Sequence, residues 1–212
     1  MTTPQENKWN DTYLADSAHF GESPSMFCIR SADIFKRFGL LTVLELGAGQ
    51  GRDTKHFIEQ GLNVIAEDIS EVACSQLRQK FGDRITVVKK DLREGIGMPM
   101  NSIDGCYAHL LLTMDFSDDE LRRIIGDVYD ALVPGGMFIF SVRNTNDLDF
   151  ESGTHEHDNV WTNLKGFSVR FYSKEEIMGF LDGFEVTRMN VFSEGGKVMY
   201  GITAKKVTRP SD

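Results

Sequence analysis

The segment that most constrains the fold is VLELGAGQGRD, residues 43–53, in which an apolar run ends in Gly47, Gly49 and Gly51. A short apolar run that breaks into glycines is typical of a buried parallel strand at its turn. Glycine adopts left-handed backbone easily and leaves no side chain between the backbone and a neighbouring group. A helical pattern follows, so the segment predicts a strand, a tight turn and a helix that begins at a ligand site.

Strand and helix patterns alternate along the rest of the chain. Apolar spacing and capping signals predict helices at 25–38, 52–60, 70–81, 117–132 and 173–181. Short apolar runs predict strands at 41–47, 62–67, 85–89, 103–112 and 137–143. Strands joined by helices of this length lie parallel and are linked by right-handed crossovers. We therefore expect a doubly wound, Rossmann-like α/β fold with a mostly parallel sheet.

The carboxyl-terminal part predicts a different connection. Two strand patterns, 184–192 and 197–206, are separated by SEGG. This spacing predicts an antiparallel hairpin that closes one sheet edge and brings the sheet to seven strands. The polar stretch 143–168 is longer than an ordinary connection and is expected to be a functional loop. The tail Thr208–Asp212 is expected to be frayed.

Length and charge narrow the classes of protein. At about 150 residues per domain, 212 residues favour a single domain, with a helical cap segment over 1–40 and the main domain over 41–212. The net charge of -9 disfavours a nucleic-acid partner. Because no stretch is long and apolar enough to span a membrane and the first residues lack a leader pattern, we expect a cytoplasmic protein. Three scattered cysteines, Cys28, Cys74 and Cys106, predict reduced core thiols.

The glycine turn is expected to bind a nucleoside. In a doubly wound sheet it lies beside the point where the strand order reverses, which is where ligands bind. A dinucleotide fingerprint would need a third glycine at position 52, where this chain has Arg52. Asp68 follows Gly49 by the spacing at which an acid accepts hydrogen bonds from both ribose hydroxyls, and Glu67 precedes it. A nucleoside without a pyrophosphate fits this pattern better than a dinucleotide.

These residues resemble class I S-adenosylmethionine-dependent methyltransferases over most of the chain. The resemblance lies in ELGAGQG at 45–51, EDIS at 67–70, KKDL at 89–92 and ALVPGG at 131–136. It implies S-adenosylmethionine as cofactor and S-adenosylhomocysteine as product. The cofactor residues taken from these motifs are Glu45, Gly47, Ala48, Gly49, Gly51, Asp68, Ile69, Asp91 and Leu92. Tyr13 and His109 are added because the first is expected to cover the site and the second to lie at the end of the fourth strand.

Within this resemblance, Glu45 and the glycine turn would hold the methionine part. Asp91 and the backbone of Leu92 would face the adenine edge. Three further segments, 9–13, 20–25 and 51–54, look like the tellurite-resistance and thiopurine-type small-molecule methyltransferases. The resemblance therefore implies a small-molecule acceptor, although the 143–168 stretch matches no acceptor site that identifies it.

The methyl group of a sulfonium is already activated, so the protein needs mainly to align the acceptor and exclude water. An oxygen or nitrogen acceptor benefits from a nearby base, whereas a thiolate does not. Candidate catalytic residues are His109 at the end of the fourth strand, His155 in the long loop, and Arg143, which with Asn144 follows the fifth strand. The alternatives are a strand-end histidine held by a hydrogen bond, a solvated loop and a surface charge.

Other side chains are further candidates for the same site. His155 and His157 beside Asp158 have the spacing of metal ligands, but no third ligand is spaced for them, so no metal is predicted. Tyr13, Phe20 and Trp161 are expected to cover the site or to pack within a lid. Arg52 has two alternatives of equal weight: the cofactor carboxylate, or an acid such as Glu45 or Asp53.

The leading hypothesis is thus an S-adenosylmethionine-dependent methyltransferase that acts on a small molecule. Three alternatives stay open. They are a binding protein without catalysis, a methyltransferase of a macromolecule, and a nicotinamide oxidoreductase, which Arg52 disfavours. The sequence contains neither an NPPY-like segment nor a basic stripe, which disfavours a nucleic-acid substrate.

Overall fold

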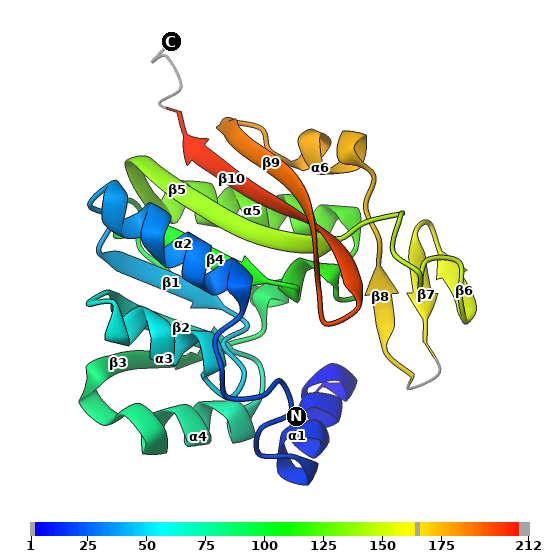
Figure 1. The fold of residues 1–212 in the computed structure, drawn as a ribbon, viewed down its shortest axis with the longest axis horizontal. Helices are drawn as coiled ribbons and strands as arrows, with labels where there is room; N and C mark the ends of the chain where they lie inside the picture. Colours follow the sequence, from blue (N-terminus) through cyan, green and yellow to red (C-terminus); the bar gives the residue numbers. More distant parts are fainter. Residues whose placement is uncertain (1–2, 164–165, 208–212) are drawn as a thin grey trace.

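Figure 1 shows the computed structural model, which describes residues 3–163 and 166–207, as a twisted central sheet with helices on both faces. The predicted tail Thr208–Asp212 lies outside the described residues. The main sheet has seven strands in the order β3-β2-β1-β4-β5-β10-β9. These strands are β1 (Thr42–Leu46), β2 (Asn63–Asp68), β3 (Ile85–Lys89), β4 (Ile103–His109), β5 (Leu132–Arg143), β9 (Phe184–Glu194) and β10 (Lys197–Lys206).

The strand directions confirm the predicted doubly wound topology. Strands β1 to β5 pair in parallel, whereas β10 pairs antiparallel with both β5 and β9. The strand order reverses between β1 and β4, so the segments that leave these two strands diverge and open a crevice at their carboxyl ends. Because β10 runs against β5, the tip of the β9–β10 hairpin lies at that same edge.

Two apolar layers hold the helices on the sheet. Helices α2 (Met26–Arg37), α3 (Arg52–Glu59) and α4 (Glu71–Phe81) cover one face, where Phe35, Phe57 and Leu77 are fully buried. Helices α5 (Asp118–Ala131) and α6 (Lys174–Phe180) cover the other face. Each buried Leu or Phe side chain contributes roughly 1.5–3 kcal/mol to folding. This packing on both faces holds the strands rigidly, and with them the carboxyl edge of the sheet.

Serine caps place the helix starts where the sequence predicts them. The hydroxyls of Ser25, Ser70, Ser117 and Ser173 each accept a hydrogen bond from a backbone N–H in the first turn of the following helix. At Ser117 and Ser173 a glutamate three residues later closes a capping box. These caps fix the helices that begin at the carboxyl edge.

Three elements differ from the sequence prediction. Helix α1 (Pro4–Ala15) precedes the predicted helix at 25–38 and is not among the helices predicted from apolar spacing. It buries only Glu6 and Tyr13, so its sequence has no apolar stripe. Strand β5 begins at Leu132, which already pairs with Ile103, so the PGG segment expected to stop the helix lies inside the strand, where the pairing register with β4 shifts. The stretch expected as a long loop folds into the strands of a second, antiparallel sheet with the order β6-β7-β8. Its strands are β6 (Thr154–His157), β7 (Val160–Thr162) and β8 (Ser168–Arg170).

Helix α1 and the second sheet meet at the carboxyl edge of the main sheet (Figure 1). The ring centroids of Trp9 and Phe167 lie 5.2 Å apart, and the Lys8 ammonium donates to the Gly166 carbonyl. Asn10 links α1 to α4, because its Oδ1 accepts hydrogen bonds from Ser70 Oγ at 2.7 Å and from the Val72 N–H at 3.3 Å. The edge that binds ligands in this fold is therefore roofed.

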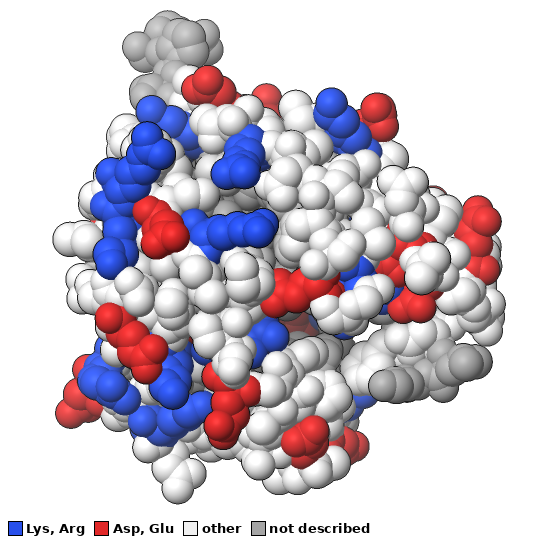
Figure 2. Space-filling view, viewed as in Figure 1, with Lys and Arg blue, Asp and Glu red and all other residues white. Residues whose placement is uncertain are grey.

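Charged side chains of both signs are mixed on the surface of the molecule (Figure 2). On the face in Figure 2, Lys and Arg side chains form separate groups with Asp and Glu side chains among them. Among the described residues, none of the helices combines the length and the apolar character needed to cross a membrane.

Gly51 offers a test of the turn. Its φ is +81°, and a Cβ there would lie 2.6 Å from Phe81 Cε2 and 2.7 Å from Leu77 Cδ2. Gly61 has a similar φ of +80° with nothing within 4 Å, so it is a matched control. Left-handed backbone costs either alanine about 1–2 kcal/mol, and overpacking adds about 1–3 kcal/mol at Gly51 alone. We expect Gly51→Ala to lower the free energy of unfolding in urea more than Gly61→Ala; equal losses would contradict the packing.

Candidate active site

The glycine turn is fixed to the end of β2 by its own backbone. Gly47, Gly49 and Gly51 all have positive φ, in agreement with the turn expected from the sequence. The N–H groups of Gly47 and Ala48 donate to the Glu67 carbonyl at 2.8 and 3.0 Å. These bonds hold the turn open toward the crevice, with the backbone of Gly47 and Gly49 uncovered by any Cβ.

Asp68 joins the turn to the next helix. Its Oδ2 accepts from the Gly49 N–H and its Oδ1 from the Ser70 N–H, both at 2.8 Å. Burial raises the pKa of Asp68 to about 6, and the hydrogen bonds from Ser70 and Gly49 oppose that rise. Each carboxylate oxygen accepts one of these N–H groups and keeps further acceptor capacity. Asp68 thus has acceptor capacity for the hydroxyls of a sugar.

A cavity of about 390 Å³ lies against this turn. The ends of β1, β2 and β4, helix α1 with the segment after it, and the tip of the β9–β10 hairpin surround it. Predicted residues that line it are Tyr13, Glu45, Gly47, Ala48, Gly49, Asp68, Ile69, Asp91, Leu92, His109 and Arg143. Gly51 does not line it and instead packs against Leu77 and Phe81. The structure therefore brings most of the predicted cofactor residues together around one space.

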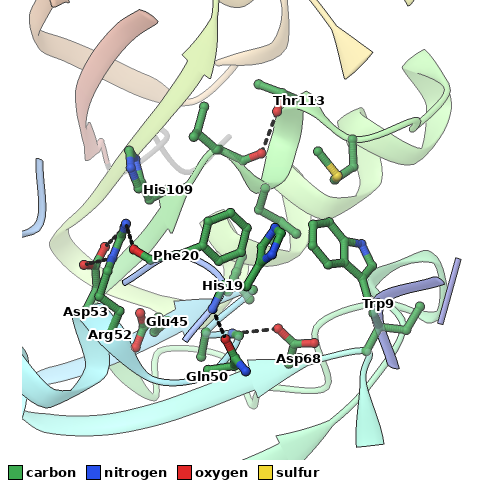
Figure 3. A pocket seen from close by; sticks show the side chains of 18 of the residues that line it. Trp9, His19, Phe20, Glu45, Gln50, Arg52, Asp53, Asp68, His109 and Thr113 are labelled. Carbon is green, nitrogen blue, oxygen red and sulfur yellow. Dashed lines mark hydrogen bonds and ion pairs between the residues drawn. The ribbon is translucent and has the colours of Figure 1, made fainter. Parts of the chain in front are cut away.

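The cavity has two ends, which Figure 3 displays. Asp68 and Trp9 lie at one end, and His109 lies with the Arg52–Asp53 pair at the other. Phe20 lies between the two ends in this view. The residues expected for the cofactor and those expected for catalysis are thus separated along the same cavity.

Glu45 lies beneath the turn. Burial, followed by the nearby charge of Asp53, raises the pKa of Glu45 to about 8, although a hydrogen bond from Thr54 Oγ1 to Oε2 at 2.6 Å opposes the rise. A carboxyl group with this pKa is largely protonated near neutral pH. An ammonium group brought beside it would favour the charged form, so Glu45 suits an amino-acid ligand.

Asp53 collects hydrogen bonds from three elements. Its Oδ1 accepts from Arg52 Nε and from the Ser25 N–H, both at 2.9 Å, and its Oδ2 accepts from Tyr107 Oη at 2.8 Å. Burial alone would raise the pKa of Asp53, but the hydrogen bonds and charge of Arg52 bring it below its ordinary value. Of the two alternatives for Arg52, the structure places its guanidinium on Asp53.

The opposite side of the turn holds the expected adenine segment. Asp91 caps a short 3₁₀ turn, because its Oδ1 accepts from the Arg93 N–H at 3.0 Å, and Leu92 is buried behind it. Glu67 lies nearby with both side-chain oxygens buried and unpaired. Burial raises the pKa of Glu67 to about 8, which the charge of Lys90 opposes and that of Asp68 supports. This carboxyl group is therefore largely protonated near neutral pH.

The candidate catalytic residues occupy different places. His109 lines the cavity, and its Nδ1 lies 2.6 Å from Ser141 Oγ. Arg143 also lines it, but its guanidinium is paired with Asp147 and Asp149 and lies over the Phe171 ring. Arg143 is therefore already neutralised by this chain's own carboxylates. Asn144 is fully buried and does not line the cavity.

The histidines of the long stretch lie in the second sheet. His155 is exposed, its Nε2 lies 2.8 Å from the Asp158 carbonyl, and it does not line the cavity. His157 lies between Asp115 and Asp158, at 3.4 and 3.5 Å. Trp161 packs against His155 with centroids 4.7 Å apart, also outside the cavity lining.

Several lining residues had no predicted role. Trp9, Phe20 and Phe167 form the aromatic roof, of which only Phe20 was expected to cover the site. Glu194 and Lys197 reach the cavity from the hairpin tip, which the sequence displays only as a turn. The segment WNDTY contains the signal for Trp9, whereas the hairpin residues depend on β10 lying beside β5.

Comparison with known proteins agrees with this geometry. Residues 43–136 match a protein-family model described as "Methyltransferase domain". Over 99 residues the chain is 34% identical to phosphoethanolamine N-methyltransferase 1 of Triticum aestivum, which covers 45% of this chain and 20% of that protein. Over 127 residues it is 28% identical to malonyl-[acyl-carrier protein] O-methyltransferase of Pectobacterium atrosepticum, covering 59% of this chain and 46% of the relative. The chain thus spans less than half the length of both relatives.

Solved structures share the whole fold. The Burkholderia thailandensis 1,6-didemethyltoxoflavin-N1-methyltransferase, solved with S-adenosylhomocysteine, superposes with a TM-score of 0.70 at 23% identity and covers 98% of this chain and 92% of its own. A methyltransferase from Clostridium acetobutylicum gives 0.71 at 16% identity, with 95% and 99% covered. Residues 43–136 thus match a methyltransferase-domain family model, and the chain as a whole shares the fold of these solved methyltransferases.

Glu67 predicts a pH dependence of stability. Its pKa of about 8 in the folded protein exceeds the ordinary value of 4.5, so between these values the folded protein keeps a proton that the unfolded chain has lost. The contribution of Glu67 to the free energy of unfolding therefore falls as pH rises through this window. As pH rises from about 5.5 to about 8, the free energy of unfolding in urea should fall more for the wild type than for Glu67→Gln, so the difference between them shifts in favour of the variant. The exposed Glu185→Gln is the control, and a pH-independent difference for Glu67→Gln would contradict the burial.

Trp9 predicts an optical signal for occupation of the cavity. The protein has 2 tryptophans, of which Trp9 lines the cavity and Trp161 does not. We expect S-adenosylhomocysteine to change the emission of the wild type and of Trp161→Phe, whose remaining indole is Trp9. Trp9→Phe should bind without an emission change. A response that persists in Trp9→Phe and disappears in Trp161→Phe would place the ligand elsewhere.

Proposed function

We propose that this chain transfers a methyl group from S-adenosylmethionine to a small-molecule acceptor. The observation that carries the proposal is one roofed cavity bordered by the glycine turn and Asp68 at one end and by His109 at the other. An adenosyl amino acid and an acceptor need to share such a space for the methyl group to pass between them.

Several residues are proposed to hold the cofactor. The backbone of Gly47 and Gly49 would lie against the methionine part, near Glu45, because these three residues line the same part of the chain's cavity wall at the end of β1. Asp68 would accept hydrogen bonds from the ribose hydroxyls. Asp91 and Leu92 would border the adenine, as the sequence resemblance implies.

When bound, the cofactor supplies a methyl group on a positively charged sulfur, which needs no further activation. The work left to this chain is to orient the two molecules and to exclude water. Tyr13, Trp9 and Phe20 from the amino-terminal segment would close the space, with Phe167 from the second sheet. Since α1 docks on α4 through Asn10, this closure is tied to the cofactor end of the cavity.

The form of the cavity favours a small acceptor. Helix α1 and the second sheet contribute aromatic rings to its lining, and its volume of about 390 Å³ is in the range of small-molecule sites. The net charge of -9 also disfavours a nucleic-acid substrate. One of the solved structures was crystallised with a small heterocyclic acceptor, 1,6-didemethyltoxoflavin.

Calorimetry tests the cofactor and a panel of acceptors tests catalysis. S-adenosylmethionine and S-adenosylhomocysteine should both bind, whereas NADH should not quench the protein fluorescence. Methyl transfer to a thiol, phenol, amine or oxyanion would support catalysis on small molecules. Binding of cofactor without transfer to any of these classes would favour a binding protein, and transfer to RNA, DNA or protein would favour a macromolecular substrate. Absence of binding would remove the proposal.

Asp68→Asn tests the ribose contact. The asparagine keeps one oxygen for the Gly49 N–H but loses the charge that the ribose hydroxyls would meet. Hydrogen bonds to charged groups contribute about 1.5–3 kcal/mol, so the Kd for S-adenosylhomocysteine should rise about tenfold to a hundredfold. Asp83→Asn, an exposed acid outside the cavity lining, should leave the Kd unchanged. Equal affinities for the wild type and Asp68→Asn would contradict the assignment.

A further inference from the structure

The ring of His109 is held between two strands and an aromatic side chain. His109 pairs in register with Ser141 of β5, and its Nδ1 lies 2.6 Å from Ser141 Oγ. Phe27 stacks against the ring with centroids 5.4 Å apart and planes inclined by 25°. In the described part of the chain Nε2 makes no hydrogen bond, and His109 lines the cavity. One ring nitrogen is thus engaged by the protein and the other is free for a ligand.

The proton of the Ser141 hydroxyl decides which nitrogen of His109 carries hydrogen. Ser141 is fully buried, and its Oγ accepts from the Leu110 N–H at 3.1 Å. Among the described residues, His109 Nδ1 is the one acceptor within reach of the hydroxyl proton. If Nδ1 carried a proton, that buried hydroxyl proton would have no partner, which costs about 1–3 kcal/mol. The arrangement that satisfies every group has Ser141 donating to Nδ1 and the ring proton on Nε2.

We propose, resting on the methyltransferase function above, that Ser141 fixes this tautomer so that His109 Nε2–H donates a hydrogen bond to the methyl acceptor. His109 then contacts substrate as a donor and not as a general base, and Ser141 is a positioning residue. The acceptor is accordingly a molecule that is nucleophilic at neutral pH without help, with a carbonyl or anionic oxygen near the atom that is methylated.

Backbone strain supports a fixed arrangement here. Leu110, next to His109, has a φ of 60°, which is unusual for a residue with a side chain. Its N–H donates to both the carbonyl and the hydroxyl of Ser141, and its carbonyl accepts from Thr113 Oγ1 at 2.6 Å. Such strain persists only where neighbouring contacts over-determine the backbone. The Ser141 hydroxyl therefore orients the end of β4 as well as the ring.

The charges around the ring agree with a neutral donor. Burial, assisted by the positive charges of Arg52 and Lys197, lowers the pKa of His109 to about 4, although Asp53 opposes the shift. Two other acids line the cavity near this end: Glu45 accepts a hydrogen bond from Thr54 Oγ1, and Glu194 accepts one from the Met26 N–H through Oε1. At neutral pH the ring is uncharged, and its lone pair on Nδ1 already accepts from Ser141.

The same end of the cavity offers a second cation. Lys197, at the start of β10, lines it, and no hydrogen bond or ion pair of its ammonium is found in the described residues. Arg52, by contrast, is paired with Asp53. A donor N–H and an unpaired ammonium on one wall favour an acceptor that presents oxygen lone pairs.

The chemical step balances without a protein base. A lone pair of the acceptor forms the bond to the methyl carbon, and the carbon–sulfur bond breaks with its electron pair staying on sulfur. The positive charge passes to the acceptor, or is cancelled when the acceptor enters as an anion. A proton that the methylated product then loses goes to water.

Nitrogen NMR of the histidine rings tests the tautomer directly. With the 5 histidines labelled with ¹⁵N, long-range ¹H–¹⁵N spectra distinguish a protonated from an unprotonated ring nitrogen, and His109→Gln assigns the signals. At neutral pH we expect His109 to show a protonated Nε2 and an unprotonated Nδ1. A protonated Nδ1 with an unprotonated Nε2, or a doubly protonated ring, would overturn the proposal.

Two serine variants separate positioning from general damage. Ser141→Ala should convert the single tautomer of His109 into a mixture. Ser141→Thr, which keeps a hydroxyl, should keep the single tautomer. Ser31→Ala removes another buried hydroxyl, bonded to the Phe27 carbonyl, and should leave the His109 signals unchanged. An unchanged tautomer in folded Ser141→Ala would contradict the role of Ser141. If that variant does not fold, the wild-type and Ser141→Thr spectra decide.

Kinetics with any acceptor found in the panel add a second readout. In His109→Phe, which lacks a donor, we expect kcat/KM to fall about tenfold to a hundredfold. The fall should be smaller in His109→Gln, because glutamine can place an amide N–H where Nε2–H lies. A general base would make both variants lose about 10²–10⁴-fold, and that outcome would overturn the proposal. Failure of the cofactor to bind would instead refute the methyltransferase function, because the NMR result needs no ligand.

Discussion

The hydrogen bonds from the glycine turn to the end of β2 are the constraint on which the site depends. Gly47 and Ala48 donate to the Glu67 carbonyl, and Gly49 donates to Asp68. These bonds hold three left-handed residues in one geometry and aim the Asp68 carboxylate at the same space as the bare backbone. Any side chain at Gly49 would meet Tyr13 of the roof. The cofactor end of the cavity is therefore determined by main-chain atoms, with little freedom left to side chains.

The other end of the cavity depends on buried charge. Asp53 binds Arg52 and receives hydrogen bonds from Ser25 and Tyr107, so α2, α3 and β4 are oriented together. Burial, assisted by the charges of Arg52 and Lys197, lowers the pKa of the nearby His109 and keeps its ring neutral, although the charge of Asp53 opposes this. Neutral hydrogen-bond donors and an unpaired lysine suit an acceptor that needs orientation, in keeping with a methyl group that is already activated. Under the function proposed above, one end would bind the methyl donor and the other would orient the acceptor.

The roof of the cavity makes the fold specific. Helix α1 contributes Trp9 and Tyr13, and the second sheet contributes Phe167, so segments about 150 residues apart in sequence close one space. Helix α1 buries only Glu6 and Tyr13 and lies on α4 through Asn10, so contacts with its neighbours order it and not an apolar face of its own. The roof of the cavity therefore comes from parts of the chain outside the family match over 43–136.

The doubly wound sheet, its helix starts and the glycine turn with Asp68 follow from the sequence alone, because each depends on the local apolar period, capping residues and backbone freedom. Tertiary structure alone decided which distant residues meet. It packed Gly51 against Leu77 and placed His155 outside the cavity lining. It also paired Arg52 with Asp53 and Arg143 with Asp147. It also brought Lys197 and the Ser141 hydroxyl to His109. Partners of this kind are set by strand order and side-chain packing, which no local pattern in the sequence encodes.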